Sequence, residues 1–228
     1  YQNKTTAVKP ALAQNKQTKT TMTDGTLTQA TFTTAAKQFL ELSQKYQDSW
    51  ELVQSPSWPS YLRKSVQQQL TRLTGTTDVD DDLAEFEEVE LDEDPSAAQV
   101  DTITTDVYRF EYHVVYSISY QVPVLYFNVF KSDGTLLRLE EAWSGFTELA
   151  GESREQLRQT LTQMEHPALF KPFLGLHPCQ TANVLRTLPD SQNVIVSFLS
   201  IYGPYVNLEL DPRYGLTGDQ KNESGENE

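Results

Sequence analysis

One cysteine is the residue of this chain best suited to covalent chemistry. Cys179 is the only cysteine in 228 residues, and it follows His177 and Pro178. A proline disfavours helical backbone at the residue before it, so we expect His177 to be extended. Because residues i and i+2 of an extended chain point to the same side, the imidazole of His177 should flank the thiol of Cys179. The stretch predicts a nucleophile whose neighbour stabilises or orients the thiolate.

A lone cysteine also has a purely structural interpretation. Free cysteines are often small buried hydrophobic residues without chemistry. The residues alone leave both interpretations open for Cys179. A papain-like protease is disfavoured, because its histidine lies far downstream of the cysteine, and none of the three histidines here follows Cys179.

Composition predicts one domain of ordinary size with tails. Hydrophobic residues make up 38% of the chain, enough for a real core. A single cysteine excludes an internal disulfide and fits a reducing compartment. No segment approaches the ~20 apolar residues of a membrane span, and no leader has the pattern of a signal peptide. We therefore expect a cytoplasmic protein without integral membrane association.

The net charge of −14 is concentrated in one run. Between Asp78 and Asp94 there are eleven acidic residues and no basic one. Such a run favours a solvated, disordered loop, which we place at about residues 74–102. A chain this acidic is a poor nucleic-acid binder, since phosphate contacts need Lys and Arg.

The tails differ in composition from the rest of the chain. Residues 1–27 are predicted to be a disordered extension, since their first part is rich in Lys, Thr and Gln. Residues 28–212 form the predicted domain. The polar, acidic residues 213–228 are predicted to be a disordered tail.

Hydrophobic periodicity predicts one long helix near the start of the domain. Residues 31–54 carry apolar side chains at steps of three and four, and Pro56 and Pro59 follow. Residues 60–73 are ambiguous, with a possible edge strand over 61–66. The periodic positions are Phe32, Ala36, Phe39, Leu42, Tyr46, Trp50 and Val53.

A strand pair follows the acidic run. Residues 107–120 are rich in aromatic and β-branched types and alternate strictly, so Phe110, Tyr112 and Val114 should share one face with residues 116, 118 and 120. Residues 122–130 predict the second strand, and Pro123 favours an edge position or a bulge there. The turn signal at residues 132–134 leads to a predicted short third strand over 135–139.

The remainder favours helices. Residues 153–164 predict a helix, residues 182–188 one or two helical turns, and residues 193–210 a helix with a kink at Gly203-Pro204. A strand interpretation of the last segment stays open. A helix, an antiparallel meander and further helices in this order predict the α+β class.

Several motifs, in consistent order and spacing over about residues 61–210, together resemble one family. The chain is similar to the autophagy-related protein ten family, the ubiquitin-like-conjugating enzymes of the autophagy-related protein twelve system. The resemblance implies a degenerate ubiquitin-conjugating-enzyme fold, an antiparallel sheet with N-terminal and C-terminal helices packed on it. The motifs are YHVVYSISYQVPVLYF from Tyr112, Asp133-Gly134, Trp143, Glu165-His166-Pro167, Pro172-Phe173, His177-Pro178-Cys179 and FLSIYGPYVNL from Phe198.

The resemblance also implies a two-step relay. Cys179 takes the ubiquitin-like protein, autophagy-related protein twelve, as a thioester from the activating enzyme, autophagy-related protein seven. A lysine of the acceptor, autophagy-related protein five, then attacks the thioester and forms an isopeptide bond. The thioester already stores the free energy of ATP, so the resemblance implies no nucleotide, metal or organic cofactor.

The resemblance also implies a difference from general ubiquitin-conjugating enzymes. They carry a His-Pro-Asn tripeptide, and here the cysteine stands where their asparagine does. The oxyanion must therefore be stabilised by another group. We expect His177 to serve, and Tyr112 is a tentative further candidate that could equally be a core aromatic. His113, on the opposite face by alternation, is expected to be a structural surface residue.

The resemblance further implies that the acceptor binds directly, and the hairpin around residues 132–134 and an exposed sheet edge could receive it by strand addition. Two other functions stay open. One is the sister autophagy enzyme, which transfers its cargo to phosphatidylethanolamine, although residues before 31 offer no apolar face for a membrane. The other is a non-catalytic binding scaffold in which Cys179 is buried.

Overall fold

The computed structural model describes residues 22–55, 58–74, 102–142, 160–188 and 190–216. The predicted acidic loop falls almost entirely outside these residues, between the end of β2 and the start of β3. The elements are α1 Gln29–Lys45, β1 Glu51–Val53, β2 Tyr61–Thr74, β3 Thr102–Ser117, β4 Val122–Phe130, β5 Leu161–Glu165, β6 Pro172–Leu176, η1 Pro178–Gln180, α4 Thr181–Arg186, α5 Val194–Tyr202, η2 Gly203–Val206 and η3 Pro212–Tyr214.

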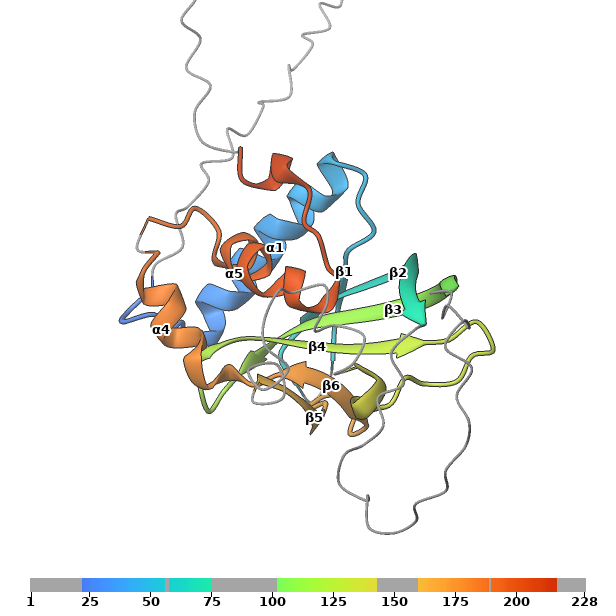
Figure 1. Cartoon of the computed structure of the whole chain (residues 1–228). Helices are drawn as coiled ribbons and strands as arrows, with labels where there is room; N and C mark the ends of the chain where they lie inside the picture. Colours follow the sequence, from blue (N-terminus) through green and yellow to red (C-terminus); the bar gives the residue numbers. More distant parts are fainter. Residues whose placement is uncertain (1–21, 56–57, 75–101, 143–159, 189, 217–228) are drawn as a thin grey trace, which may run out of the picture.

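The described strands form one sheet of six in the order β1-β2-β3-β4-β6-β5, and every neighbouring pair is antiparallel. Figure 1 shows α1 and α5 on one face of this sheet, with α4 near one end of the strands. The core lies between these helices and the sheet. The predicted α+β class and the antiparallel sheet with helices from both ends of the chain are confirmed.

Strict alternation makes β3 the centre of the core. Phe110, Tyr112 and Val114 are fully buried under the helices, as their shared face predicted. Ile118 and Tyr120 follow the same alternation but are 53% and 45% exposed, because β3 ends at Ser117 and the chain turns. Alternation therefore identified the core face but extended it beyond the end of the strand.

The first helix is shorter than predicted. It begins after Thr28, whose side chain caps the Thr31 amide, and it ends at Lys45 instead of residue 54. Gln47 has a left-handed φ of 58°, which reverses the chain into β1. Trp50 nevertheless packs edge-on against Phe39, with ring centroids 5.4 Å apart. The apolar spacing continued past the helix because the returning chain buries its side chains in the same core.

Two predicted strands were placed wrongly. Residues 61–66 are the start of the 14-residue β2, which pairs with both β1 and β3 and so is not an edge strand. The predicted third strand over 135–139 is only an isolated bridge between Phe130 and Leu136. The sheet continues instead through β6, which takes the place beside β4. Local sequence does not show which of two strands, distant in the chain, will pair with β4.

Pro123 lies in an interior strand, contrary to the predicted edge position or bulge. β4 pairs with β6 only through Tyr126–Gly175 and Phe127–Leu174. Pro123 is opposite Tyr116 at the far end of the strand, outside that short ladder. Its missing N–H therefore costs no ladder hydrogen bond on the β6 side.

The predicted helix over 153–164 is also wrong in its last part. Leu161–Glu165 is strand β5, paired with β6, while residues 153–159 lie outside the described part. Helical turns in α4 and a helix from residue 194 are confirmed, and the strand interpretation of that segment is wrong. The Gly203-Pro204 kink appears as the change from α5 to η2. A Cβ on Gly203 would lie 2.3 Å from the Leu208 carbonyl oxygen, so this close return needs glycine.

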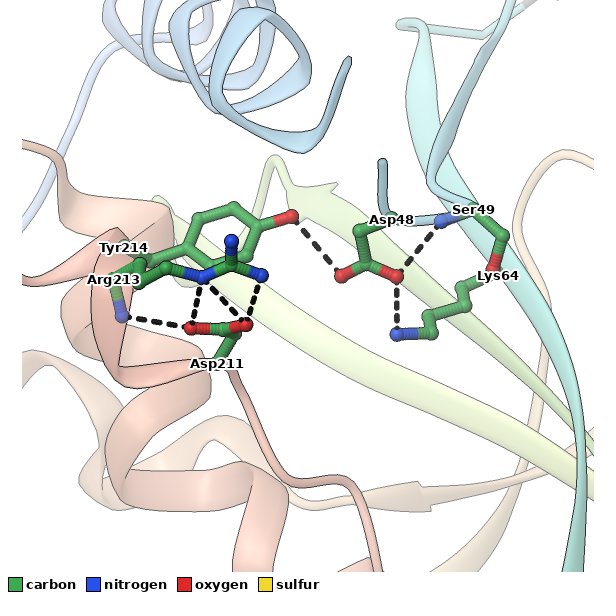
Figure 2. A network of polar contacts seen from close by, with 6 residues as sticks. All are labelled: Asp48, Ser49, Lys64, Asp211, Arg213 and Tyr214. Atoms are coloured by element: carbon green, nitrogen blue, oxygen red, sulfur yellow. Dashed lines mark hydrogen bonds and ion pairs between the residues drawn. The ribbon is translucent and has the colours of Figure 1, made fainter. Parts of the chain in front are cut away.

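Both predicted tail boundaries cut into the folded region. Leu27 is buried, and its carbonyl accepts a 2.8 Å hydrogen bond from the Tyr116 hydroxyl. At the other end Tyr214 is 1% exposed and donates to Asp48, which also accepts from Lys64 and from the Ser49 amide (Figure 2). Residues 22–27 and 213–216 therefore belong to the described structure, and residues 1–21 and 217–228 lie outside it.

Candidate active site

Strand β6 leads directly into the cysteine stretch. His177 is extended, with φ −62° and ψ 129°, as Pro178 predicted. Its N–H donates to the Thr160 carbonyl at 2.8 Å, which continues the hairpin pairing to this residue. Pro178 then begins the short helix η1, and the free thiol of Cys179 is exposed on it. The structure thus places Cys179 in reach of a partner protein, unlike the buried cysteine of the scaffold interpretation.

His177 contacts the backbone of Cys179. Its Nδ1 accepts a 3.3 Å hydrogen bond from the Cys179 N–H, so it caps η1. The prediction that the imidazole and thiol share a side assumed extended chain through Cys179, and that assumption is wrong because Pro178–Gln180 is helical. Since Nδ1 is an acceptor, neutral His177 carries its proton on Nε2, where it can donate.

Aromatic residues that sequence reasoning did not select also lie at this site. The ring of Tyr120, in the turn after β3, stands edge-on to His177 at 5.8 Å. Burial raises the pKa of Tyr202, while a hydrogen bond with the Thr181 side chain lowers it, and Cys179 and Tyr205 act on it electrostatically. The FLSIYGPYVNL motif contains Tyr202 and Tyr205, but only the packing of α5 against α4 brings Tyr202 to Thr181, two residues after the cysteine.

The helix that follows the cysteine is held by the N-terminal segment. Gly25 has a left-handed φ of 79°, and a Cβ there would lie 1.9 Å from the Ala182 carbonyl oxygen. Arg186 forms an exposed ion pair with Asp24 at 3.3 Å. The N–H of Leu27 donates to Gln121 in the β3–β4 turn. The segment 22–27, predicted to be disordered, therefore packs beside the active stretch.

Tyr112 lies in the core, under the helices. It is fully buried, and its hydroxyl donates to the carbonyls of Val206 and Asn207 at 2.9 and 3.1 Å. Burial raises its pKa well above the ordinary value. This geometry favours the core-aromatic interpretation that the sequence left open. The structure does not bring Tyr112 together with Cys179.

His113 is on the opposite face, as alternation predicted, but it is not a surface residue. It is 1% exposed, and its ring contacts His166, Tyr61 and Phe173. Its Nδ1 is 3.0 Å from His166 Nε2, and its Nε2 is 3.1 Å from a Glu111 oxygen. The sequence analysis included His166 only as part of one family motif, since nothing local pairs residues 53 positions apart.

Within the described ranges, no three His, Cys, Asp or Glu side chains gather as a metal ion would require. The described helices also include none with the length and apolar character needed to cross a membrane.

Comparison with known proteins identifies the family. Residues 31–213 match the sequence model of the family described as autophagocytosis associated protein, active-site domain. The human ubiquitin-like-conjugating enzyme ATG10 is 35% identical over 207 residues, covering 83% of this chain and 93% of the human protein. The chain belongs to the ATG10 family. It is a ubiquitin-like protein conjugating enzyme of autophagy, as the sequence motifs predicted.

Other relatives match a smaller part of the chain. ATG10 of Arabidopsis thaliana is 34% identical over 125 residues, 49% of this chain and 54% of that protein. Autophagy-related protein 3 of Candida glabrata is 31% identical over 112 residues, 47% of this chain and 33% of that protein. The similarity to this sister enzyme thus covers much less of both chains than the similarity to human ATG10.

Proposed function

We propose that this ATG10-family enzyme uses Cys179 to carry the ubiquitin-like protein twelve as a thioester. The Cys179 thiolate attacks the carbonyl of the thioester on the activating enzyme, autophagy-related protein seven. A new C–S bond to Cys179 forms, and the cysteine of the activating enzyme leaves as a thiolate. The amine of a lysine on acceptor protein five then attacks the carbonyl. A C–N bond forms, Cys179 leaves as the thiolate, and the lysine proton passes to solvent.

The observation that carries this proposal is the exposed free thiol at the exit of β6. A thioester nucleophile must be reached by two large partners in turn, and an exposed cysteine on a short helix permits that. The family membership supports the same chemistry, since the relatives are named conjugating enzymes.

His177 is the proposed oxyanion donor. Its Nδ1 is occupied by the Cys179 amide, which leaves the Nε2 proton of the neutral ring for the developing oxyanion or the thiolate. The capping bond also fixes the ring beside the cysteine before any substrate arrives. Tyr112 has no part in this proposal, because its hydroxyl is engaged in the core.

We also propose that the acceptor binds at a free sheet edge or at the hairpin of residues 131–136. β4 is covered by β6 over Tyr126 and Phe127, so the free sheet edges of the described strands are β1 and β5. The hairpin at residues 131–136 turns at Gly134, which has a φ of 84° and open space around it, since a Cβ there would meet no heavy atom within 4 Å. This hairpin stays a candidate for acceptor contact, and strand addition would have to use β1 or β5.

A charging assay tests the proposal. The full chain would be mixed with activating enzyme, ATP and ubiquitin-like protein twelve, then separated on a non-reducing gel. We expect a reductant-sensitive adduct that Cys179→Ala abolishes, and discharge of that adduct by protein five. No adduct on folded protein would refute the proposal in favour of a scaffold. An adduct with the lipid pathway's cargo would favour the sister reaction on phosphatidylethanolamine.

The place of action is part of the same proposal. A reducing environment would keep Cys179 as a thiol, and we propose the cytoplasm for that reason.

A further inference from the structure

The hairpin that carries the cysteine has a short attachment to the rest of the sheet. β6 joins β4 through two residue pairs, Tyr126–Gly175 and Phe127–Leu174. By contrast, the β3–β4 ladder runs without a break from Arg109–Phe130 to Ser117–Val122. Since β6 leads straight to Cys179, any further contact that holds this hairpin also sets the position of the thiol.

A buried polar chain supplies such a contact. His166, in the turn after β5, is fully buried, and its Nε2 lies 3.0 Å from Nδ1 of His113 on β3. His113 Nε2 lies 3.1 Å from Oε1 of Glu111, also on β3. The hairpin is therefore bonded directly to β3, across the intervening β4.

The backbone of the turn determines which atom donates in each hydrogen bond between His166, His113 and Glu111. His166 Nδ1 accepts from the amides of Ala168 and Leu169 at 3.3 and 3.2 Å, so it carries no proton. Nε2–H of neutral His166 must then donate to His113 Nδ1, and His113 Nε2–H must donate to the Glu111 carboxylate. Each group has a partner of the right kind, which is the condition under which a buried polar chain is stabilising.

The surroundings of the two histidines exclude water and keep His166 neutral. Rings of Tyr61, Tyr126 and Phe173 lie 5.1, 5.1 and 4.9 Å from the ring of His166. Burial lowers the pKa of His166 to about 4, with His113 acting in the same direction and Glu111 opposing it. The hydrogen bond from His113 lowers the pKa of Glu111, and Arg63 and Arg109 contribute to that shift.

We infer that His166 is a positioning residue for Cys179. His166 acts by bonding the β5–β6 hairpin to His113, and through it to Glu111, on β3. The inference rests on the proposed role of Cys179. Without this link, the hairpin would keep only its short ladder to β4, and the thiol would move relative to the surfaces that bind the partners. Misplacement of a reacting group by about 1 Å can cost about a hundredfold in rate.

Two substitutions separate the roles of the two ring nitrogens of His166, Nδ1 bonded to the turn and Nε2 facing His113. His166→Asn keeps an oxygen near the Nδ1 position, which can still accept from Ala168 and Leu169, but it cannot reach His113. His166→Gln places an N–H donor near the Nε2 position, toward His113, but loses the acceptor for the turn. If His166 positions the hairpin through His113, Gln should restore more activity than Asn.

Tyr214→Phe serves as a matched control. It removes the buried hydroxyl that donates to Asp48, on the helix side of the sheet, and leaves the β5–β6 hairpin unchanged. Thermal unfolding would be measured for all variants, and kinetics would be run well below every midpoint.

The assay is single-turnover charging and discharge of the full chain as a function of partner concentration. For His166→Asn we expect the maximal single-turnover rate constant to fall about tenfold or more, with the half-saturating concentration of the activating enzyme nearly unchanged, and smaller effects for His166→Gln and Tyr214→Phe. NMR of the imidazole nitrogens should show His166 protonated on Nε2 and bare on Nδ1 at neutral pH.

Failure of the inference differs from failure of the proposed function. If the parent enzyme does not charge on Cys179, the proposed function fails. If the parent charges but both His166 variants match it, or lose activity only as far as Tyr214→Phe does at equal stability, the positioning role is overturned. An Nδ1-protonated His166 would overturn it as well.

Discussion

Tyr112 and His113 are neighbours on β3, yet they bury their polar groups on opposite faces of the sheet in different ways. Tyr112 sits in the apolar core under α1 and α5, and one hydroxyl bonds to two backbone carbonyls. His113 sits in an aromatic environment on the other face and bonds to two ionisable side chains. The first arrangement is insensitive to pH, whereas the second depends on the proton occupancy of His166. The same strand therefore combines a permanent core with a contact that acid can open.

The largest effect should come from the helix-covered face. Tyr112→Ala should lower the free energy of unfolding by about 3–5 kcal/mol, because it leaves a large cavity. Tyr112→Phe should cost about 1–3 kcal/mol, because the two carbonyls lose their donor. Urea unfolding measures both values. Folded Tyr112→Phe should charge Cys179 at the parental rate, and a specific loss of charging would return Tyr112 to the catalytic site.

The opposite face should show the next largest effect, as a dependence on pH. The pKa of His166 is about 4 in the folded protein, against about 6.5 when unfolded. The unfolded state then binds more protons between these values, so stability falls as the pH drops from about 6.5 toward 4, by up to about 3 kcal/mol.

Urea unfolding at a series of pH values measures this dependence. Glu111, whose pKa is lowered, adds its own loss only below its ordinary value of 4.5. His166→Asn should remove the component between pH 6.5 and 4.5. A parental protein whose stability is flat over that window would contradict a neutral buried His166.

Gly25→Ala should have an intermediate effect on the segment that supports α4. The left-handed backbone and the 1.9 Å approach to the Ala182 carbonyl both oppose a Cβ, for a cost of about 1–3 kcal/mol. Gly134→Ala is the matched control, since Gly134 has a φ of 84° but open space around it. Thermal unfolding should rank Gly25→Ala as the more damaging, and equal costs would argue against close packing of residues 22–27 on α4.

The smallest effect should be a gain at the tip of the β5–β6 turn. Phe170 is 70% exposed and has a left-handed φ of 53°, which costs a bulky residue about 1–2 kcal/mol. Phe170→Gly removes that strain, and the greater entropy of unfolded glycine offsets part of the gain. We expect up to about 1 kcal/mol of stabilisation by chemical unfolding, while Leu169→Gly, without a left-handed φ, should destabilise. A loss in Phe170→Gly would show that the exposed ring makes a stabilising contact.

Most of the central sheet could be predicted from local sequence. Residues 122–130 were predicted as a strand with the bounds that β4 has, and the alternation of β3 identified Phe110, Tyr112 and Val114 as one buried face. These features follow from the two-residue period of a strand, which can be read from the order of polar and apolar residues without knowing the rest of the fold. The end of the helix after Lys45 was missed because Trp50 keeps a helical spacing, although it lies in the returning chain just before β1 and packs into the same core.

The candidate site could be predicted only in part. The Pro178 ring dictates an extended His177, which the structure confirms. The single cysteine indicated a candidate nucleophile, and the structure shows its thiol exposed, while its role stays a proposal. The contact of Tyr120 with His177 was not, because it depends on where the β3–β4 turn lies relative to the end of β6.

By itself, the sequence determined the buried face of β3, the local backbone before Cys179 and, through its motifs, the family. These depend on short-range sterics and on residue order. Only the tertiary structure decided that His113 is buried, that it meets His166, and that Tyr214 closes the core. Each of those outcomes joins residues far apart in the chain, and whether a polar side chain is solvated or paired is settled by what the rest of the fold places against it.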